Sequence, residues 1–409
     1  MENSEIIIVS ISGEDKPGVT AALTGILGEH DAVILDIGQA NIHHSLSLAI
    51  IFETKAEKSG EILKKLLFKA TELGVMIRFT PITQEGYSTW VNLQGKNRYI
   101  ITALGKTLSS KQISKVAGII LKYKLNIEGI KRLTGRVPIE MKSRPDRSCI
   151  EFSVRGNIDD DSAVSLKQEF MEFSAKYQID IAFQEESMYR RMRRLICFDM
   201  DSTLIQTEVI DELAERAGVG SEVKAITEAA MRGDIDFSES FKRRISLLKG
   251  LDESVMKEIA ENLPITDGMV RLVRILKKSG YKIAILSGGF TYFGNYLREK
   301  YGFDYVYANE LEIIDGKLTG RHVGDIVDGK RKAELLRLLA QVEKVDIKQT
   351  VAVGDGANDL PMLSIAGLGI AFHAKPKVKE NAKQSLSTVG LDGILYFIGY
   401  KDSMLEGEF

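Results

Sequence analysis

Leu-Ile-Cys-Phe-Asp-Met-Asp-Ser-Thr-Leu, residues 195–204, is the stretch of sequence that decides the fold. A short apolar run ends here in two carboxylates, Asp199 and Asp201, which are followed by two hydroxyls. Such a run is typical of a buried parallel strand, and the acids then lie just past its C-terminal end. Because open α/β sheets bind their ligands at that edge, the stretch predicts both an α/β fold and the location of a site.

Two later stretches have the same design. The apolar run 282–286 leads into Ser-Gly-Gly-Phe at 287–290, and the run 350–353 leads into Gly-Asp-Gly-Ala-Asn-Asp at 354–359. Three buried strands are therefore expected to bring five side chains to one edge of the sheet: Asp199, Asp201, Ser287, Asp355 and Asp359. Carboxylates gathered in this way repel one another unless a cation is present. Hard oxygen ligands around a phosphate suit Mg²⁺.

These three motifs resemble the signature motifs of the haloacid dehalogenase-like hydrolases, and within that superfamily they are most similar to those of the phosphoserine phosphatase family. The resemblance covers about residues 190 to 400. It implies a Rossmann-like parallel-sheet core, which we expect at residues 195–205 and 269–401. Apolar residues at helical spacing between the first two motifs predict a helical cap at residues 206–268, which would exclude water from the site.

The N-terminal part of the chain contains one pattern twice. Residues 5–84 and 97–185 both read as strand, helix, two strands, helix and strand. This order predicts two ferredoxin-like βαββαβ modules, which we assign to residues 1–85 and 96–186.

The first copy resembles an ACT domain, the small-molecule sensor of amino-acid enzymes, in its loop 13–18. The resemblance implies effector binding at Asp15, Pro17 and Gly18, often across a dimer interface. Backbone N–H groups at the start of a helix favour a carboxylate there, although a plain tight turn is the alternative interpretation. The second copy has Gly-Lys-Thr-Leu at 105–108 instead and is interpreted as a scaffold.

Residues 187–194 form a basic linker that contains four arginines. An arm that binds nucleic acid is one interpretation. The whole chain, however, has 55 Lys and Arg against 57 Asp and Glu, for a net charge of -2. That balance favours a solvated linker helix and argues against nucleic acid or an anionic membrane as a partner.

The remaining composition indicates a cytoplasmic protein. No unbroken apolar run approaches the length of a membrane span, and the N-terminus lacks the basic region of a signal peptide. The two cysteines, Cys149 and Cys197, fit a reducing compartment, and Cys197 is better interpreted as a small buried side chain than as a nucleophile.

Hydrolysis of a phosphate ester needs a nucleophile, a proton donor for the leaving group and positive charge against the phosphoryl oxygens. Asp199 is the predicted nucleophile and would form an aspartyl-phosphate. Asp201 would protonate the leaving serine oxygen and then deprotonate the attacking water. The family resemblance implies the same roles. Mg²⁺ would be held by the Asp199 side chain, the Asp201 backbone carbonyl and Asp355, with Asp359 behind them.

The phosphate and the cap contribute the other predicted contacts. Ser287 and the N–H of Gly288 would bind phosphoryl oxygens, and Asn358 would contact the phosphate or the backbone nearby. A lysine is needed against the transition-state charge; Lys332 matches the family position, and Lys330 is the alternative.

The cap is expected to recognise the amino-acid part of phosphoserine. Glu208 can pair with its ammonium group, and Arg244 can bind its carboxylate through two parallel hydrogen bonds. Met231 and Phe237 match lid contacts of the family. Taken alone, each of these charges is more often part of an ordinary helix surface.

The sequence therefore predicts a Mg²⁺-dependent enzyme that converts O-phospho-L-serine to L-serine and phosphate, the last step of serine biosynthesis. The ACT-like module suggests a homodimer regulated by an amino acid, with L-serine as the candidate effector. Two alternatives stay open: a phosphotransferase that passes the phosphate to another hydroxy amino acid such as homoserine, and an amino-acid-sensing binding protein with an inactive hydrolase half. The intact set of acids argues against the second alternative.

Overall fold

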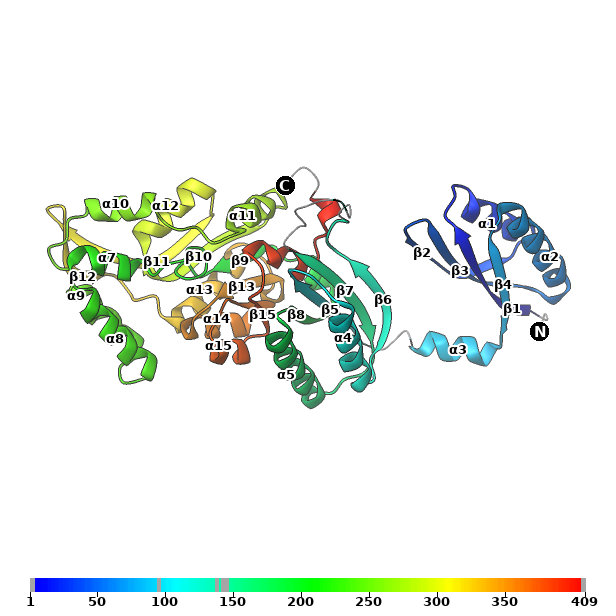
Figure 1. The fold of residues 1–409 in the computed structure, drawn as a ribbon, viewed down its shortest axis with the longest axis horizontal. Helices are drawn as coiled ribbons and strands as arrows, with labels where there is room; N and C mark the ends of the chain where they lie inside the picture. Colours follow the sequence, from blue (N-terminus) through cyan, green and yellow to red (C-terminus); the bar gives the residue numbers. More distant parts are fainter. Residues whose placement is uncertain (1–3, 94–96, 137–139, 141–146, 406–409) are drawn as a thin grey trace. The chain divides into compact units, whose positions relative to one another are not determined.

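The computed structural model describes residues 4–93, 97–136, 140 and 147–405, except for the side chains of Leu93 and Met231. The chain divides into two compact units, Met1–Lys96 and Asn97–Phe409 (Figure 1). Within the described ranges, no helix has both the length and the apolar character needed to cross a membrane.

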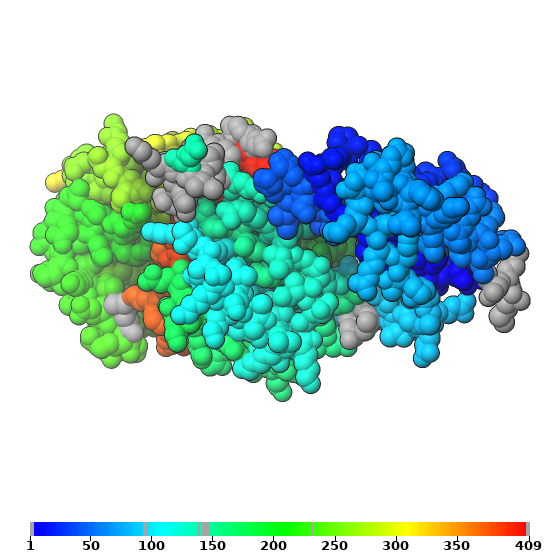
Figure 2. Space-filling model, turned by 45° about the vertical axis from the view of Figure 1, so that its right-hand side comes forward, coloured from blue at the N-terminus to red at the C-terminus, as the bar shows by residue number. Residues whose placement is uncertain are grey.

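The first unit, whose atoms are blue to cyan in Figure 2, is a single antiparallel sheet with the helices α1 and α2 packed against it and a third helix, α3, after the last strand. The strand order is β2-β3-β1-β4, and every neighbouring pair is antiparallel. Apolar residues of β1, β3, α1 and α2 form its core. The elements are β1 (Ser4–Glu14), α1 (Val19–Glu29), β2 (Val33–Ile42), β3 (Ser45–Lys55), α2 (Ala56–Leu73), β4 (Met76–Ile82) and the additional helix α3 (Gln84–Leu93), which the sequence did not predict.

The second unit begins with another βαββαβ module, whose strand order is β6-β7-β5-β8. Its helices begin at clear caps: the Ser109 hydroxyl accepts from the N–H of Gln112, and the Asp159 carboxylate accepts from the N–H of Ser162. The elements are β5 (Arg98–Gly105), α4 (Ser110–Lys122), β6 (Asn126–Arg132), β7 (Ser148–Arg155), α5 (Asp160–Tyr177) and β8 (Asp180–Glu185).

A seven-stranded sheet follows, with β9 (Leu195–Phe198) at its centre between β10 and β13. The strand order is β12-β11-β10-β9-β13-β14-β15, and all neighbouring pairs are parallel except β11 with β12. The other strands are β10 (Lys282–Phe290), β11 (Tyr305–Ile314), β12 (Lys317–Val323), β13 (Thr350–Gly354), β14 (Leu368–Phe372) and β15 (Gln384–Leu386).

Helices cover both faces of this sheet (Figure 1), so all four residues of the central strand β9 are buried. Ile196 and Phe198 pack with α11 and α12, whereas Leu195 and Cys197 face α13 and α14. The predicted fold class, an α/β core with a Rossmann-like parallel sheet that two ferredoxin-like modules precede, is confirmed. The helices are α11 (Met269–Lys278), α12 (Thr291–Tyr301), α13 (Gly329–Val342), α14 (Leu360–Ile365), α15 (Pro376–Asn381) and α16 (Ile394–Phe397).

Between β9 and α11 lie four helices, in the segment for which the sequence predicted a cap. Phe241 and Ile245 of this segment are buried in the same core cluster as the sheet residue Phe290. The four helices are α7 (Val209–Ala217), α8 (Gly220–Arg232), α9 (Phe237–Ser246) and α10 (Ser254–Glu261).

Buried polar groups join the second module to the hydrolase sheet. The carboxamide of Gln384 on β15 exchanges two hydrogen bonds with the backbone of Phe183 on β8, at 2.9 and 2.6 Å. The buried carboxylate of Asp180 accepts from the N–H groups of Ser387 and Thr388, each at 2.8 Å. Side-chain bonds thus continue the polar pairing between the edges of two sheets.

The basic linker differs from its prediction as a solvated helix. It contains the short helix α6 (Met188–Arg191), but Arg190 and Arg193 are only 7% and 4% exposed. Arg190 forms an ion pair with Glu151 at 2.8 Å, and Arg193 donates to the side chain of Gln184 at 2.9 Å. The expectation was wrong for these two residues because the second module packs over the linker and supplies their partners.

Candidate active site

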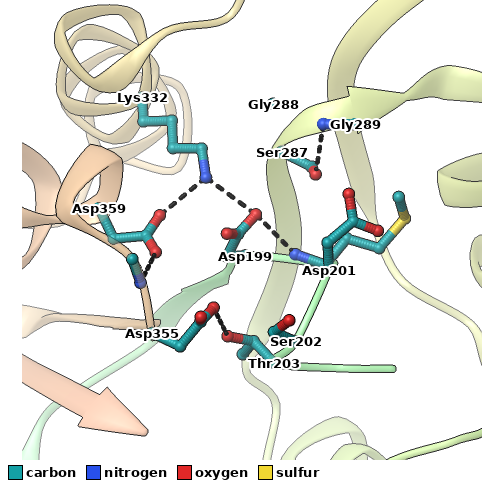
Figure 3. A network of polar contacts seen from close by, with 12 residues as sticks. Asp199, Asp201, Ser202, Thr203, Ser287, Gly288, Gly289, Lys332, Asp355 and Asp359 are labelled. Carbon is teal, nitrogen blue, oxygen red and sulfur yellow. Dashed lines mark hydrogen bonds and ion pairs between the residues drawn. The ribbon is translucent and has the colours of Figure 1, made fainter. Parts of the chain in front are cut away.

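Three strands of the hydrolase sheet end at one place (Figure 3). Asp199 and Asp201 follow β9, Ser287 lies near the end of β10, and Asp355 follows β13. Because these strands are adjacent and parallel, their C-terminal ends form one edge of the sheet. Asp359 and Lys332 complete the group from the segment after β13 and from the first turn of α13.

Lys332 lies at the centre of this site and is fully buried. Its Nζ is 2.8 Å from Oδ1 of Asp199 and 2.7 Å from Oδ1 of Asp359 (Figure 3). Burial alone would lower the pKa of Lys332, but the two carboxylates outweigh it and raise the pKa, so the ammonium stays charged. Lys330, the alternative candidate, is exposed at the start of the same helix.

The acids around Lys332 form a group that can hold a metal ion. One oxygen each of Asp199, Asp355 and Asp359 lies within 4.8 Å of the others. Burial and the nearby charge of Asp199 raise the pKa of Asp355 to about 8 and that of Asp359 to about 7. Thr203 donates to Asp355 at 3.1 Å, and the N–H of Gly356 donates to Asp359 at 2.9 Å. A bound cation would relieve the repulsion that raises these pKa values.

Asp201 has a different environment from Asp199. Its carboxylate is absent from the acidic group that can hold a metal, and the N–H of Val209 donates to it at 3.4 Å. Burial and the charges of Glu208 and Asp199 raise the pKa of Asp201 well above its usual range. The raised pKa favours the protonated form of Asp201, which can donate a proton.

Glycine is required opposite Asp201, a feature that the sequence reasoning missed. A Cβ on Gly289 would lie 2.5 Å from Oδ2 of Asp201, so any larger residue would displace that carboxylate. The N–H of Gly289 also donates to the Ser287 hydroxyl at 2.9 Å. The second glycine of the Ser-Gly-Gly motif was the available signal for both contacts.

Two residues of the segment between β9 and α11, Glu208 and Phe237, contact the loop that follows β9 and the end of β10. Glu208 precedes α7 and accepts from the Ser202 hydroxyl at 2.8 Å. Burial and nearby acids, Asp199 and Asp211, raise the pKa of Glu208. Phe237 begins α9, and its ring lies 2.9 Å from where a Cβ of Gly288 would be, so it covers the Ser-Gly-Gly loop.

Arg244 also lies on α9 and is half-buried. Its Nε–H donates to the carbonyl of Ser240 at 3.4 Å. Within the described part of the chain, its terminal nitrogens form neither a hydrogen bond nor an ion pair. Burial lowers the pKa of Arg244, and the charges of Glu208 and Asp211 act in the opposite direction. A half-buried guanidinium in this state has donors available for a carboxylate.

The other predicted site residues lie near the acidic group, in α8 and in the first unit. Asn358 is half-buried beside the acidic group, and its backbone carbonyl lies 2.6 Å from where a Cβ of Gly329 would be. Met231 lies in α8, but its side chain is outside the described part of the structure. In the first unit, Asp15, Pro17 and Gly18 line a cavity of about 500 Å³, together with Gln39 and Asn41 among others.

Comparisons with known proteins agree with this architecture. Residues 5–80 match the family model of the ACT domain, and residues 196–364 match that of the haloacid dehalogenase-like hydrolases. The chain is 38% identical over 401 residues to a phosphoserine phosphatase of Streptomyces coelicolor, with 98% of this chain and 93% of that protein covered. It is 40% identical over 325 residues to one from Archaeoglobus fulgidus, with 80% and 89% covered.

A solved structure is also similar. The probable phosphoserine phosphatase from Vibrio cholerae, in its unliganded form, superposes with a TM-score of 0.57 at 35% identity. The match covers 74% of this chain and 86% of that chain.

Proposed function

Because the chain belongs to the phosphoserine phosphatase family of the haloacid dehalogenase-like hydrolases, with an ACT domain in its first unit, we propose that it hydrolyses O-phospho-L-serine through an aspartyl-phosphate on Asp199. The observation that carries this mechanism is the pairing of two adjacent acids with opposite roles. Asp199 is an ion-paired carboxylate, whereas Asp201 has a pKa raised well above its usual range.

The nucleophile is oriented by two donors. Lys332 Nζ and the N–H of Met200 both contact Oδ1 of Asp199 at 2.8 Å. Among the described residues, Oδ2 accepts no hydrogen bond. An oxygen of Asp199 attacks phosphorus, and the bond between phosphorus and the serine oxygen breaks.

Asp201 handles both proton transfers. It gives its proton to the leaving serine oxygen, and L-serine departs. As a carboxylate it then takes a proton from the water that attacks the aspartyl-phosphate. The phosphorus–oxygen bond to Asp199 breaks, which releases phosphate and restores both acids. The Ser287 hydroxyl, the N–H of Gly288 and the Lys332 ammonium bind phosphoryl oxygens during these steps, with Asn358 beside them.

We propose Mg²⁺ as the metal ion, held by Asp199, Asp355 and the backbone carbonyl of Asp201, with Asp359 behind them. The donor set supports this choice, because all its members are hard oxygen ligands and the raised pKa values indicate excess negative charge. When bound, Mg²⁺ supplies positive charge against the phosphoryl oxygens.

The amino-acid part of the substrate is assigned to the cap. Glu208 pairs with the ammonium group, and Arg244, whose terminal nitrogens are available, binds the carboxylate. Phe237 and Met231 close over the substrate. In the first unit, we propose that the cavity beside Asp15, Pro17 and Gly18 binds L-serine as an effector in a cytoplasmic homodimer, supported by the ACT-domain match.

The test is phosphate release by the purified full chain with Mg²⁺ and O-phospho-L-serine. Asp199→Asn is expected to abolish release, and Asp325→Asn, at an exposed loop residue, is the matched control. L-Homoserine added to the same assay distinguishes hydrolysis from transfer, because transfer yields phosphohomoserine in place of free phosphate. Absence of phosphate release by the unmodified chain would contradict the proposal.

A further inference from the structure

The pairing of β10 with β11 is interrupted at the Ser-Gly-Gly loop. Leu286 lies opposite Tyr307 and Phe290 lies opposite Asn309, so three residues of β10 span the distance that Ala308 alone spans on β11. The excess residues form a bulge, and backbone groups in a bulge lose their ladder partners. Because an unpaired buried carbonyl is costly, this bulge needs another source of hydrogen bonds.

Asn309 supplies that source through its side chain. Its Nδ2 donates to the carbonyl of Gly288 at 2.8 Å, and its Oδ1 accepts from the N–H of Val327, also at 2.8 Å. Asn309 is 1% exposed, so its carboxamide is shielded from water; the bond to Val327 is fully buried and the bond to Gly288 is partly buried. One partner is a pure acceptor and the other a pure donor, so the orientation of the amide is determined.

One of these bonds acts on the Ser287 hydroxyl. The carbonyl of Gly288 and the N–H of Gly289 belong to a single trans peptide plane and point in opposite directions. Asn309 holds the carbonyl end, and the N–H end donates to Ser287 Oγ at 2.9 Å. With that bond accepted, the proton of the Ser287 hydroxyl remains available for a phosphoryl oxygen.

The other bond acts on the helix that carries Lys332. Val327 directly precedes Asp328, whose carboxylate accepts from the N–H of Arg331 at 2.8 Å and so caps α13. The N–H of Lys332 donates to the carbonyl of Asp328 at 2.9 Å. The bond from Val327 to Asn309 therefore anchors the start of the helix from which Lys332 reaches Asp199.

We propose that Asn309 is a positioning residue that sets the spacing between the Ser287 hydroxyl and the Lys332 ammonium. It acts through the peptide plane of Gly288 and through Val327. The inference rests on the proposed function, in which these two groups bind the phosphoryl oxygens.

Two substitutions separate the two bonds. Asn309→Asp keeps an acceptor for the N–H of Val327 and loses the donor to Gly288, whereas Asn309→Leu loses both at similar size. We expect kcat to fall about 10-fold for the first and about 100-fold for the second, the range typical of residues that orient active-site groups. The dissociation constant of inorganic phosphate, measured by calorimetry on the full chain with Mg²⁺, should rise in the same order.

Asn262→Asp is the matched control, because its amide also donates to a backbone carbonyl, that of Glu258, at the exposed end of α10. It should leave kcat and phosphate binding unchanged. Circular dichroism and the melting midpoint report whether each variant is folded. If neither Asn309 variant folds, or if all lost activity returns on correction for the folded fraction, the residue is only structural and the proposal fails.

A double-mutant cycle tests the route through Ser287. In a Ser287→Ala background no hydroxyl remains to be oriented, so Asn309→Asp should cost clearly less than in the unmodified chain. A structural role independent of Ser287 would give the same factor in both backgrounds, within about twofold, and would overturn the proposal.

Phosphate binding keeps this inference separable from the proposed function. If the unmodified chain binds phosphate but does not hydrolyse O-phospho-L-serine, the proposed function fails. The double-mutant cycle of Ser287 and Asn309 is then measured through the dissociation constant of phosphate in place of kcat. If the unmodified chain hydrolyses the substrate and the Asn309→Asp variant has the same kcat and phosphate affinity as the unmodified chain, the proposed function stands and this inference fails.

Discussion

The two ferredoxin-like modules share one strand order and use it differently. In each, the last strand lies at an edge beside the first: β4 next to β1, and β8 next to β5. Side chains of β4 are exposed or half-buried, whereas the first five residues of β8 are all buried. Edge strands must be covered or left to solvent, and the hydrolase sheet covers the β8 edge of the second module. The same fold thus serves once as a separate unit and once as a wall of the catalytic unit.

Removing the modules by truncation should give the largest difference between them. A chain of residues 97–409 retains the complete second unit and is expected to keep its kcat and melting midpoint. A chain of residues 187–409 loses the partners of Gln384, Ser387 and Arg193, so its melting midpoint should fall by on the order of 10 °C. Calorimetry and phosphate release measure both. Equal midpoints for the two chains would show that the second module contributes no stability.

A pair of point substitutions tests the same edges more finely. Asp180→Ala leaves the N–H groups of Ser387 and Thr388 without their acceptor and should lower the free energy of unfolding of the second unit by about 2–3 kcal/mol. Met76, at the equivalent start of β4, is 73% exposed. Met76→Ala should therefore change the first unit by less than about 0.5 kcal/mol. Urea unfolding of each unit measures both changes. Similar losses of unfolding free energy for the two substitutions would contradict the difference between the two edge strands.

In the absence of metal, pH should change the stability of the second unit more than that of the first unit. Asp355 has a folded-state pKa raised to about 8, far above the ordinary value for an aspartate in the unfolded chain. The folded state therefore holds a proton that the unfolded state releases, and stability is lost as pH rises from about 4 to about 8. The melting midpoint of the second unit in chelator should fall over that range, and Mg²⁺ should reverse the fall. A melting midpoint that rises with pH over this range would contradict the prediction.

The smallest effect is expected at the loop between the first strand and first helix of each module. Gly18 has φ 94 and lines the cavity of the first unit, so Gly18→Ala strains the loop by about 1 kcal/mol and should weaken L-serine binding. Lys106→Ala, in the corresponding loop of the second module, is the control. Calorimetry with L-serine measures both. Weakening by Lys106→Ala alone would move the effector site to the second module.

Residues near one another in sequence were predicted well because local patterns carry the necessary information. Apolar runs that end in Asp199, Ser287 and Asp355 indicated adjacent buried strands, and parallel strands share one C-terminal edge. The repeated strand-helix pattern indicated both ferredoxin-like modules in the same way. Asn309 had one local signal, a carboxamide in a strand, where this residue type is depleted. Its two backbone partners, Gly288 and Val327, lie 21 and 18 residues away, so no local pattern could identify them.

The sequence alone therefore determined the fold class, the three strand ends and the acids that follow them, since periodicity and strand direction depend on neighbouring residues. Only the tertiary structure decided that the second module is part of the hydrolase unit, that Arg190 and Arg193 are buried and that Lys332 is held between Asp199 and Asp359. Each of these features depends on a partner from a distant segment. Charge and polarity indicate that a side chain needs such a partner, but the packing of the elements determines which one it finds.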